Sequence, residues 1–267
     1  MRLGPSTVNS WEVKADFVDL VRPALPPRRC AISAQSQNII VDLNRTAVII
    51  VDMQNDFCTA GGWFDAKGAD IEPMRRPVPV LNALLPNLRD AGATILWVNW
   101  GNRADLANLP PSVFHAGNPA GDGFGYGDTT PEGRAPILER DSWGAAVIDD
   151  LSVDPGDILV LKSRFSGFAD NELDSVLRNR AISTLLFMGI NTDRCVLATL
   201  MDASFLGYDC VLVEDACATS SPTFCTDAVL YLMKQLYGFT TTSADILEAL
   251  RAQSADTKNL RAASAGQ

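Results

Sequence analysis

Histidine is almost absent from this sequence: His115 is the only one among 267 residues. Any Ser-His-Asp or Cys-His mechanism would have to use that side chain, and a zinc site built from several histidines is excluded. His115 lies in the Gly/Pro-rich segment 109–136, where a solvated loop residue is the simpler interpretation. Any catalytic chemistry therefore has to be sought in other side chains.

The sequence also lacks long apolar runs, paired cysteines and an excess of positive charge. No run approaches the roughly 18 apolar residues that cross a bilayer, and the N-terminus has no apolar block typical of a signal peptide. The six cysteines form no CxxC pair, which favours a reduced, cytoplasmic protein. A formal net charge of −10 argues against nucleic acid or an anionic membrane as a partner.

What the sequence does contain is a regular alternation of short apolar runs and amphipathic segments. The run 46–52 is rich in β-branched residues, as expected for a strand buried on both faces of a parallel sheet. Segment 79–90 carries leucines at helical spacing. Further strands are predicted at 94–99, 157–162, 184–188, 209–213 and 239–241, and further helices at 171–180, 193–206, 224–237 and 244–251. The alternation predicts an α/β fold with a doubly wound, mostly parallel six-stranded sheet flanked by helices.

These elements are predicted to form one domain, 46–253, with segments of other character around and within it. Residues 1–45 show little periodicity and are expected to pack along the surface or onto a neighbouring subunit. Residues 254–267 are expected to form a frayed tail. A polar, glycine-rich insert at about 102–140 is typical of a segment that covers an active site or makes a subunit contact. Its stretch 123–127, Gly-Phe-Gly-Tyr-Gly, does not fit GxGxxG and precedes no predicted helix, so it is not interpreted as a dinucleotide site.

Three chemically suggestive residues stand at the carboxyl ends of three predicted strands. Cys195 lies at a strand-to-helix turn, where helix-terminal amides favour a thiolate and lower the pKa of a thiol. Asp52 and Lys162 end two other predicted strands. Taken singly, a structural cysteine, an exposed acid and a surface lysine are simpler interpretations. Because open parallel sheets bind ligands beyond the carboxyl ends of their strands, however, the three should share one crevice.

Together these residues supply a nucleophile, a base and a cation. Asp52 can take the thiol proton directly where no histidine is available. Lys162 is expected to hold the carboxylate ionised and to stabilise the thiolate, since nearby opposite charges favour the charged forms. Attack on an amide carbonyl creates an oxyanion, for which the backbone N–H groups of Asn191 and Cys195 are natural donors.

At these positions the sequence resembles the isochorismatase-like cysteine hydrolases. The similarity covers about 46–243 and rests on three motifs in this order: 48–57, Lys162 with 164–168, and 189–196. The resemblance implies a Cys-Asp-Lys triad that maps onto Cys195, Asp52 and Lys162. It also implies a non-proline cis peptide at Ile190–Asn191, which would direct the Asn191 amide into the oxyanion hole. Members of this family commonly form homodimers or homotetramers.

The resemblance also narrows the reaction. Isochorismatases tend to lack the cysteine, so Cys195 favours amide or ureide hydrolysis. Nicotinamidases carry a metal site with a histidine near the first strand, which this chain lacks. Segments 164–168 and 173–178 look most like the ureidoacrylate and biuret hydrolases, whereas residues 1–45 and the insert differ from the ureidoacrylate enzyme.

The leading hypothesis is a hydrolase without metal or other cofactor that cleaves a C–N bond of a small linear carbamoyl or ureido compound. The reaction would pass through a covalent thioester on Cys195. An amidase for an aryl or alkyl amide remains open, as does a catalytically silent interaction module.

Six residues near the predicted crevice are candidates for substrate binding. Each also has a simpler interpretation: a turn residue, apolar packing or a surface salt bridge. The candidates are Gln54, Phe57, Asn99, Trp100, Asn102 and Arg164. The cysteines 58, 210, 217 and 225 are interpreted as core thiols.

Overall fold

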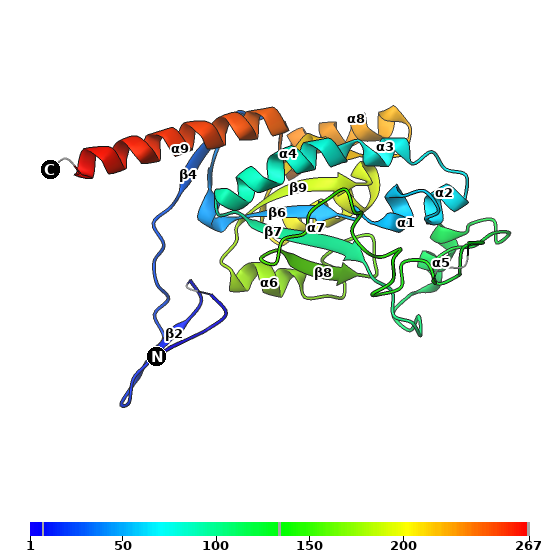
Figure 1. Ribbon diagram of the computed structural model, residues 1–267, viewed down its shortest axis with the longest axis horizontal. Helices are drawn as coiled ribbons and strands as arrows, with labels where there is room; N and C mark the ends of the chain where they lie inside the picture. Colours follow the sequence, from blue (N-terminus) through cyan, green and yellow to red (C-terminus); the bar gives the residue numbers. More distant parts are fainter. Residues whose placement is uncertain (7, 133–134, 266–267) are drawn as a thin grey trace.

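A computed structural model (Figure 1) describes residues 1–6, 8–132 and 135–265, with side chains to residue 255. Its centre is a six-stranded parallel sheet, in the order β11-β10-β9-β6-β7-β8. The strands are β6 (Thr46–Val51), β7 (Thr94–Trp100), β8 (Ile158–Lys162), β9 (Thr184–Ile190), β10 (Asp209–Ala218) and β11 (Gly238–Thr241). The predicted fold class is confirmed.

The apolar runs explain which strands lie in the middle of the sheet. Every residue of β6 and of β9 is buried, as a β-branched or leucine-rich run on a doubly covered sheet requires. The chain moves from β6 through β7 to β8 in one direction, and from β9 through β10 to β11 in the other. The order of the strands therefore reverses between β6 and β9. This is the place where open α/β sheets form a ligand crevice.

Helices cover both faces of the sheet. In Figure 1, α4 (Pro77–Asp90) and α9 (Ser243–Ala265) lie above it and α6 (Leu173–Asn179) lies below it. The predicted leucine stripe of α4 is buried at Leu81, Leu84, Leu85 and Leu88. Other helical segments include η1 (Leu43–Arg45), α1 (Asn55–Cys58), α2 (Trp63–Ala66), α3 (Glu72–Arg75), α7 (Leu197–Phe205), α8 (Thr223–Leu232) and η3 (Met233–Tyr237). None of the described helices is long and apolar enough to cross a membrane.

The terminal helix is longer than predicted. It was expected at 244–251 with a frayed tail from 254, whereas α9 continues to Ala265. The reason is local, because 252–265 is rich in alanine, a strong helix former, and contains neither glycine nor proline. The last two residues of the predicted tail lie outside the described residues.

The N-terminal extension has more regular structure than its sequence suggests. Strands β1 (Arg2–Leu3), β2 (Trp11–Val13) and β3 (Val18–Asp19) form a small antiparallel sheet that projects from the core in Figure 1. Strands β4 (Arg29–Ile32) and β5 (Ile39–Asp42) form a hairpin. Strand β4 packs against α9, so this part of the extension lies along the surface as predicted.

The insert leaves β7 and returns to it. Asn102 donates its backbone N–H to the carbonyl of Leu138 (2.8 Å) and accepts one from Arg140 (3.0 Å). The base of the insert is therefore closed next to the carboxyl end of the sheet. The described part contains one helix, α5 (Pro111–Gly117), where His115 is exposed. The rest is turns and irregular backbone.

Candidate active site

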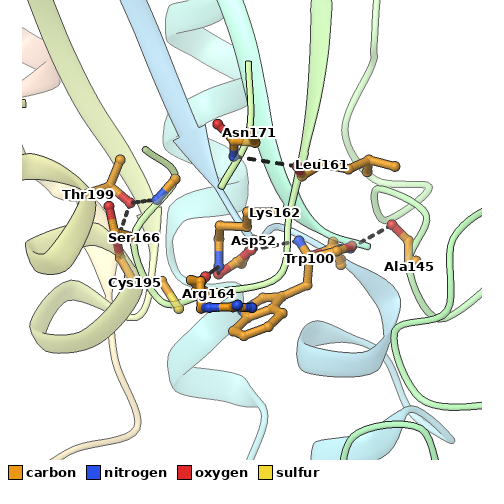
Figure 2. Close-up of polar contacts among 12 residues, drawn as sticks. Asp52, Trp100, Ala145, Leu161, Lys162, Arg164, Ser166, Asn171, Cys195 and Thr199 are labelled. Atoms are coloured by element: carbon orange, nitrogen blue, oxygen red, sulfur yellow. Dashed lines mark hydrogen bonds and ion pairs between the residues drawn. The ribbon is translucent and has the colours of Figure 1, made fainter. Parts of the chain in front are cut away.

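An acid and a lysine meet at the carboxyl end of the sheet. Asp52 follows β6 in a left-handed conformation (φ 52°), and Lys162 is the last residue of β8. Their charged atoms, Oδ2 and Nζ, lie 2.9 Å apart, and each residue is only 1% exposed (Figure 2). Strand β7 separates β6 from β8, so the long lysine side chain spans a neighbouring strand to reach the acid. The predicted pair is therefore brought together.

Further contacts hold this pair in place. Oδ1 of Asp52 accepts the backbone N–H of Trp100 (3.1 Å), and Nζ of Lys162 donates to the carbonyl of Arg164 (3.2 Å). The same Nζ lies 4.2 Å from the centre of the Trp100 ring. A left-handed aspartate costs on the order of 1 kcal/mol and persists only where surrounding contacts hold it. The backbone therefore presents the carboxylate at the end of β6 in one orientation.

The pKa of Asp52 is shifted in the direction opposite to the one expected from the sequence. Burial raises the pKa of Asp52, and the charge and hydrogen bond of Lys162 offset this only in part. Lys162 was expected to hold the acid ionised, and it does lower the pKa of Asp52, but the effect of removing the carboxylate from water is larger. The consequence is chemical, because a carboxylate of raised pKa is a stronger base towards a thiol.

Cys195 lies in a wide turn, η2 (Thr192–Val196), between β9 and α7. Its carbonyl accepts the Thr199 hydroxyl (2.6 Å), and the same Thr199 oxygen accepts the N–H of Gly167 (2.9 Å). The residue is 5% exposed. Its side chain is a hydrogen-bond partner of Asp52, and Figure 2 shows the sulfur beside the Asp52–Lys162 pair. Nucleophile, acid and lysine therefore share one enclosed site.

The thiol of Cys195 is not a preformed thiolate, contrary to the prediction from its place in the turn. Burial raises the pKa of Cys195 to about 12, and Lys162 and the Trp100 side chain lower it only in part. The negative charge of Asp52 acts in the opposite direction and raises it. The physical reason for the error is desolvation, which exceeds the effect of a helix terminus in a closed site. A protonated thiol needs a base before it can act as a nucleophile, and the Asp52 carboxylate is its hydrogen-bond partner.

The turn before Cys195 has the predicted backbone geometry. The Ile190–Asn191 peptide is cis, which confirms that prediction. The side-chain Oδ1 of Asn191 accepts the hydroxyl of Thr219 and the N–H of Ser220, both at 3.2 Å. Gly189 has a φ of 103°, and a side chain there would collide with the Val51 backbone of β6. These contacts fix the turn, while the oxyanion role of the Asn191 and Cys195 amides remains a prediction.

Two of the predicted substrate ligands have structural roles instead. Gln54 is fully buried: its Nε2 donates to the carbonyls of Trp100 (2.8 Å) and Ala145 (2.7 Å), and its Oε1 accepts the Trp100 N–H (2.9 Å). The guanidinium of Arg164 pairs with Asp170 (2.9 Å) and donates to the Asn108 carbonyl (2.6 Å). Gln54 therefore connects the end of β7 to the Ala145 loop, and Arg164 connects Asn108 to Asp170.

The other candidates line the enclosed region to different degrees. Asn102 uses its side-chain amide to hold the Ile137 carbonyl (3.2 Å) at the base of the insert. Asn99 is buried on β7, and its Oδ1 has no hydrogen-bond partner among the described residues. Phe57 packs in an aromatic group with Trp63, and Trp100 covers the lysine. Asn99 and Trp100 therefore remain the stronger candidates.

Sequence reasoning missed two aromatic residues of this region. Tyr126 from the insert contacts both Trp100 and Trp63, with ring centres 4.8 Å apart in each pair. Ionisation of Cys195 or of Asp52 raises the pKa of the Tyr126 hydroxyl, so the three groups lie near one another. A tyrosine between two glycines in the insert was the available signal, but only the folded chain shows where it points.

Other titratable groups do not add a further centre. Within the described residues, no group of three or more His, Cys, Asp or Glu side chains could hold a metal ion. All six cysteines are free thiols; of the four interpreted as core thiols, Cys58 and Cys210 are buried, whereas Cys217 and Cys225 are partly exposed. The chemistry of the described site thus rests on the residues at the ends of β6, β8 and β9.

Comparison with known proteins gives a consistent result. The Isochorismatase domain profile matches residues 46–245. A ureidoacrylate amidohydrolase from Caulobacter segnis is 33% identical over 227 residues, which cover 83% of this chain and 92% of that protein. A cysteine hydrolase structure from Pseudomonas syringae has a TM-score of 0.67 at 24% identity, covering 80% of this chain and 95% of that one. An isochorismatase family protein from Desulfovibrio vulgaris has a TM-score of 0.62 at 29% identity, with coverages of 78% and 98%.

Proposed function

The chain belongs to the isochorismatase family, and we propose that it is a cysteine amidohydrolase acting on a small linear carbamoyl or ureido compound. The observation that carries this proposal is the buried Asp52–Lys162 pair, 2.9 Å across, beside the thiol of Cys195. Burying an ion pair has a desolvation cost, and a protein that only binds a partner does not require such a pair in its interior. The ureidoacrylate amidohydrolase among its relatives supports the choice of substrate class.

In the first half of the proposed reaction, Asp52 takes the thiol proton while sulfur attacks the carbonyl carbon. The raised pKa of Asp52 favours this transfer. The carbonyl π electrons move to oxygen, and the N–H groups of Asn191 and Cys195 donate to the resulting oxyanion. The oxyanion then collapses, the C–N bond breaks, and Asp52 returns its proton to the leaving nitrogen. Ammonia or an amine departs, leaving the acyl or carbamoyl group on Cys195.

In the second half, water releases the group from sulfur. Asp52 takes a proton from water while the water oxygen attacks the thioester carbon. The C–S bond then breaks, and the proton held by Asp52 returns to the departing sulfur, which restores the starting state. The positive charge of Lys162 balances the negative charge that moves between Asp52 and sulfur during both halves. No step of this scheme calls for a metal, so we propose that the reaction proceeds without one.

A screen for ammonia release tests the function directly. Wild-type protein should release ammonia from N-carbamoyl amino acids or biuret-like compounds, and a chelator should leave the rate within about twofold. Cys195→Ala should lower the rate by on the order of 10⁴-fold or more, as removal of a covalent nucleophile does. Its melting temperature should stay close to the wild-type value, because the substitution removes a single sulfur atom and leaves the Asp52–Lys162 pair in place.

The covalent step is tested by intact mass after acid quench. We expect the mass of one acyl or carbamoyl group on wild-type protein and none on Cys195→Ala. Turnover by Cys195→Ala at the wild-type rate would refute the assignment of Cys195 as the nucleophile. Loss of activity on treatment with a chelator, restored by added zinc, would refute the metal-free scheme. Turnover of aryl amides alone would favour the amidase alternative.

A further inference from the structure

The Gly-Phe-Gly-Tyr-Gly stretch of the insert places one side chain, Tyr126, against the site. The glycines around it provide the room. A Cβ on Gly117 would lie 2.7 Å from Cδ2 of Tyr126, and one on Gly125 would lie 3.1 Å from the Gly117 backbone. The end of α5 and the Tyr126 segment therefore approach each other without side chains between them. This motif, which has no use as a dinucleotide site, serves to seat an aromatic ring.

The ring of Tyr126 lies one aromatic side chain away from the triad lysine. Its centre is 4.8 Å from that of Trp100, and another partner of the Trp100 ring is Nζ of Lys162, at 4.2 Å from the ring centre. On another side Tyr126 contacts Trp63, again with 4.8 Å between ring centres. Tyr126 is 6% exposed. The insert thus contributes a wall of the enclosed site, next to the reacting groups.

Two hydrogen-bond donors in this wall have no partner among the described residues. The indole N–H of Trp63 is buried and makes no hydrogen bond to any of them. The hydroxyl of Tyr126, a residue that is 6% exposed, makes none either, but it is not among the fully buried unpaired atoms. Leaving a buried polar group without a partner costs roughly 1–3 kcal/mol, and this cost applies to the Trp63 indole. The hydroxyl of Tyr208, by contrast, donates to Asp174 at 2.8 Å. Both the Trp63 indole and the Tyr126 hydroxyl are therefore available to a ligand.

The local charges decide what the phenol can do. Burial raises the pKa of Tyr126 well above its ordinary value, and ionisation of the nearby Cys195 and Asp52 raises it further. The hydroxyl therefore keeps its proton throughout the working pH range and is available as a donor. The indole N–H can only donate. The two donors suit acceptor oxygens, and the positive charge of Arg194, which also acts on Tyr126, suits an anion.

We propose that Tyr126 is a specificity-determining residue whose hydroxyl donates a hydrogen bond to a carboxylate of the substrate, with the Trp63 indole as a second donor. This inference rests on the proposed function and refines it: the preferred substrates are ureido acids, which carry a carboxylate beside the carbamoyl group. The insert thereby selects the substrate, while the strand ends perform the chemistry.

The test compares an acid with its neutral counterpart. Tyr126→Phe removes only the hydroxyl, and the KM for N-carbamoyl-β-alanine should rise about tenfold or more with kcat within about twofold, as expected for loss of a hydrogen bond to a charged group. The inhibition constant of N-propylurea, which lacks the carboxylate, should not change. Tyr231→Phe is the matched control, because Tyr231 lies on α8 and is 65% exposed. It should leave both values unchanged.

A second variant moves the ring instead of removing the hydroxyl. Gly117→Ala should displace Tyr126 and raise the same KM while the phenol is retained. Melting temperature and the rate of Cys195 alkylation, measured on both variants, report whether the fold and the nucleophile are intact. A rise in KM with these two readouts unchanged is the expected result.

The possible failures are distinguishable. An unchanged KM for the ureido acid in Tyr126→Phe, with wild-type turnover intact, overturns this inference and leaves the proposed function standing. Equal weakening of the acid and the neutral urea overturns the selection of a carboxylate, because it would assign Tyr126 a packing role. If wild-type protein releases no ammonia from any ureido compound and forms no adduct on Cys195, the proposed function fails, and this inference fails with it.

Discussion

Asp52 and Lys162 stand at the ends of paired strands of the sheet, whereas Tyr126 stands in an insert made largely of turns. Both regions contribute to one enclosed site. At the strand ends the two charged groups engage each other, and their 2.9 Å ion pair is nearly inaccessible to water. In the insert, the Tyr126 hydroxyl has no hydrogen-bond partner among the described residues.

The difference between the two regions reflects their tasks. Proton transfer between sulfur and carboxylate requires positions held to within a fraction of an ångström, which paired strands provide. Recognition of the rest of a substrate requires unoccupied hydrogen-bonding groups, and loops can change these without disturbing the sheet. On this basis, substitutions at the strand ends should affect catalysis and stability together, and substitutions in the insert should affect mainly the choice of substrate.

The largest expected effect is that of Lys162→Met. It leaves Asp52 buried without a cation, so we expect a loss of about 3–5 kcal/mol in the free energy of unfolding at neutral pH, together with loss of turnover. The deficit should shrink at low pH. Below the ordinary pKa of 3.8, Asp52 of the variant is protonated in both the folded and the unfolded state. At higher pH the unfolded state loses that proton freely, whereas the folded state must either keep it or bury an unpaired negative charge.

Denaturant unfolding at several pH values measures this deficit. Lys14→Met is the control, because Lys14 pairs with Glu12 at 3.7 Å on the surface and half of its side chain is exposed. Such a pair contributes about 0–1 kcal/mol. If Lys162→Met were as mild as Lys14→Met, the strand-end pair would not be the structural element described above.

A smaller effect concerns the state of the nucleophile. Because the pKa of Cys195 is raised to about 12, its alkylation by iodoacetamide in the free protein should accelerate about tenfold per pH unit from pH 7 to 10, without a plateau. Peptide mapping after partial reaction identifies the labelled cysteine, with Cys195→Ala as the blank. A plateau below pH 8 would mean that Lys162 holds a preformed thiolate, and the concerted proton transfer would then be wrong.

The smallest effect is expected at Arg164, which belongs to neither task. Arg164→Ala removes a partly exposed ion pair to Asp170 and a bond to the Asn108 carbonyl. We expect a loss of about 1 kcal/mol in stability and a KM within about twofold of wild type. A large rise in KM for a ureido acid alone would instead make Arg164 a carboxylate ligand and weaken the contrast drawn with Tyr126.

The sequence by itself determined the frame of this protein. Runs such as 46–52 and 184–188 are apolar on both faces, so they specify central parallel strands, and the residues that end such strands must share one edge. Asp52, Lys162 and Cys195 can therefore be grouped from the order of the strands alone. Strand periodicity is a local property of the chain, and this is why it is legible in the sequence.

Only the tertiary structure decided the electrostatics and the lining of the site. Burial, which depends on everything that packs around a group, reversed the expected direction of the Cys195 pKa. The side-chain amide of Gln54 proved to be consumed by the backbone of Trp100 and Ala145, contacts 46 and 91 residues away along the chain. Tyr126 reached the site through an irregular loop. The turn that carries Cys195 is thus specified locally, but the reactivity of its sulfur and the choice of substrate depend on distant segments that only folding brings together.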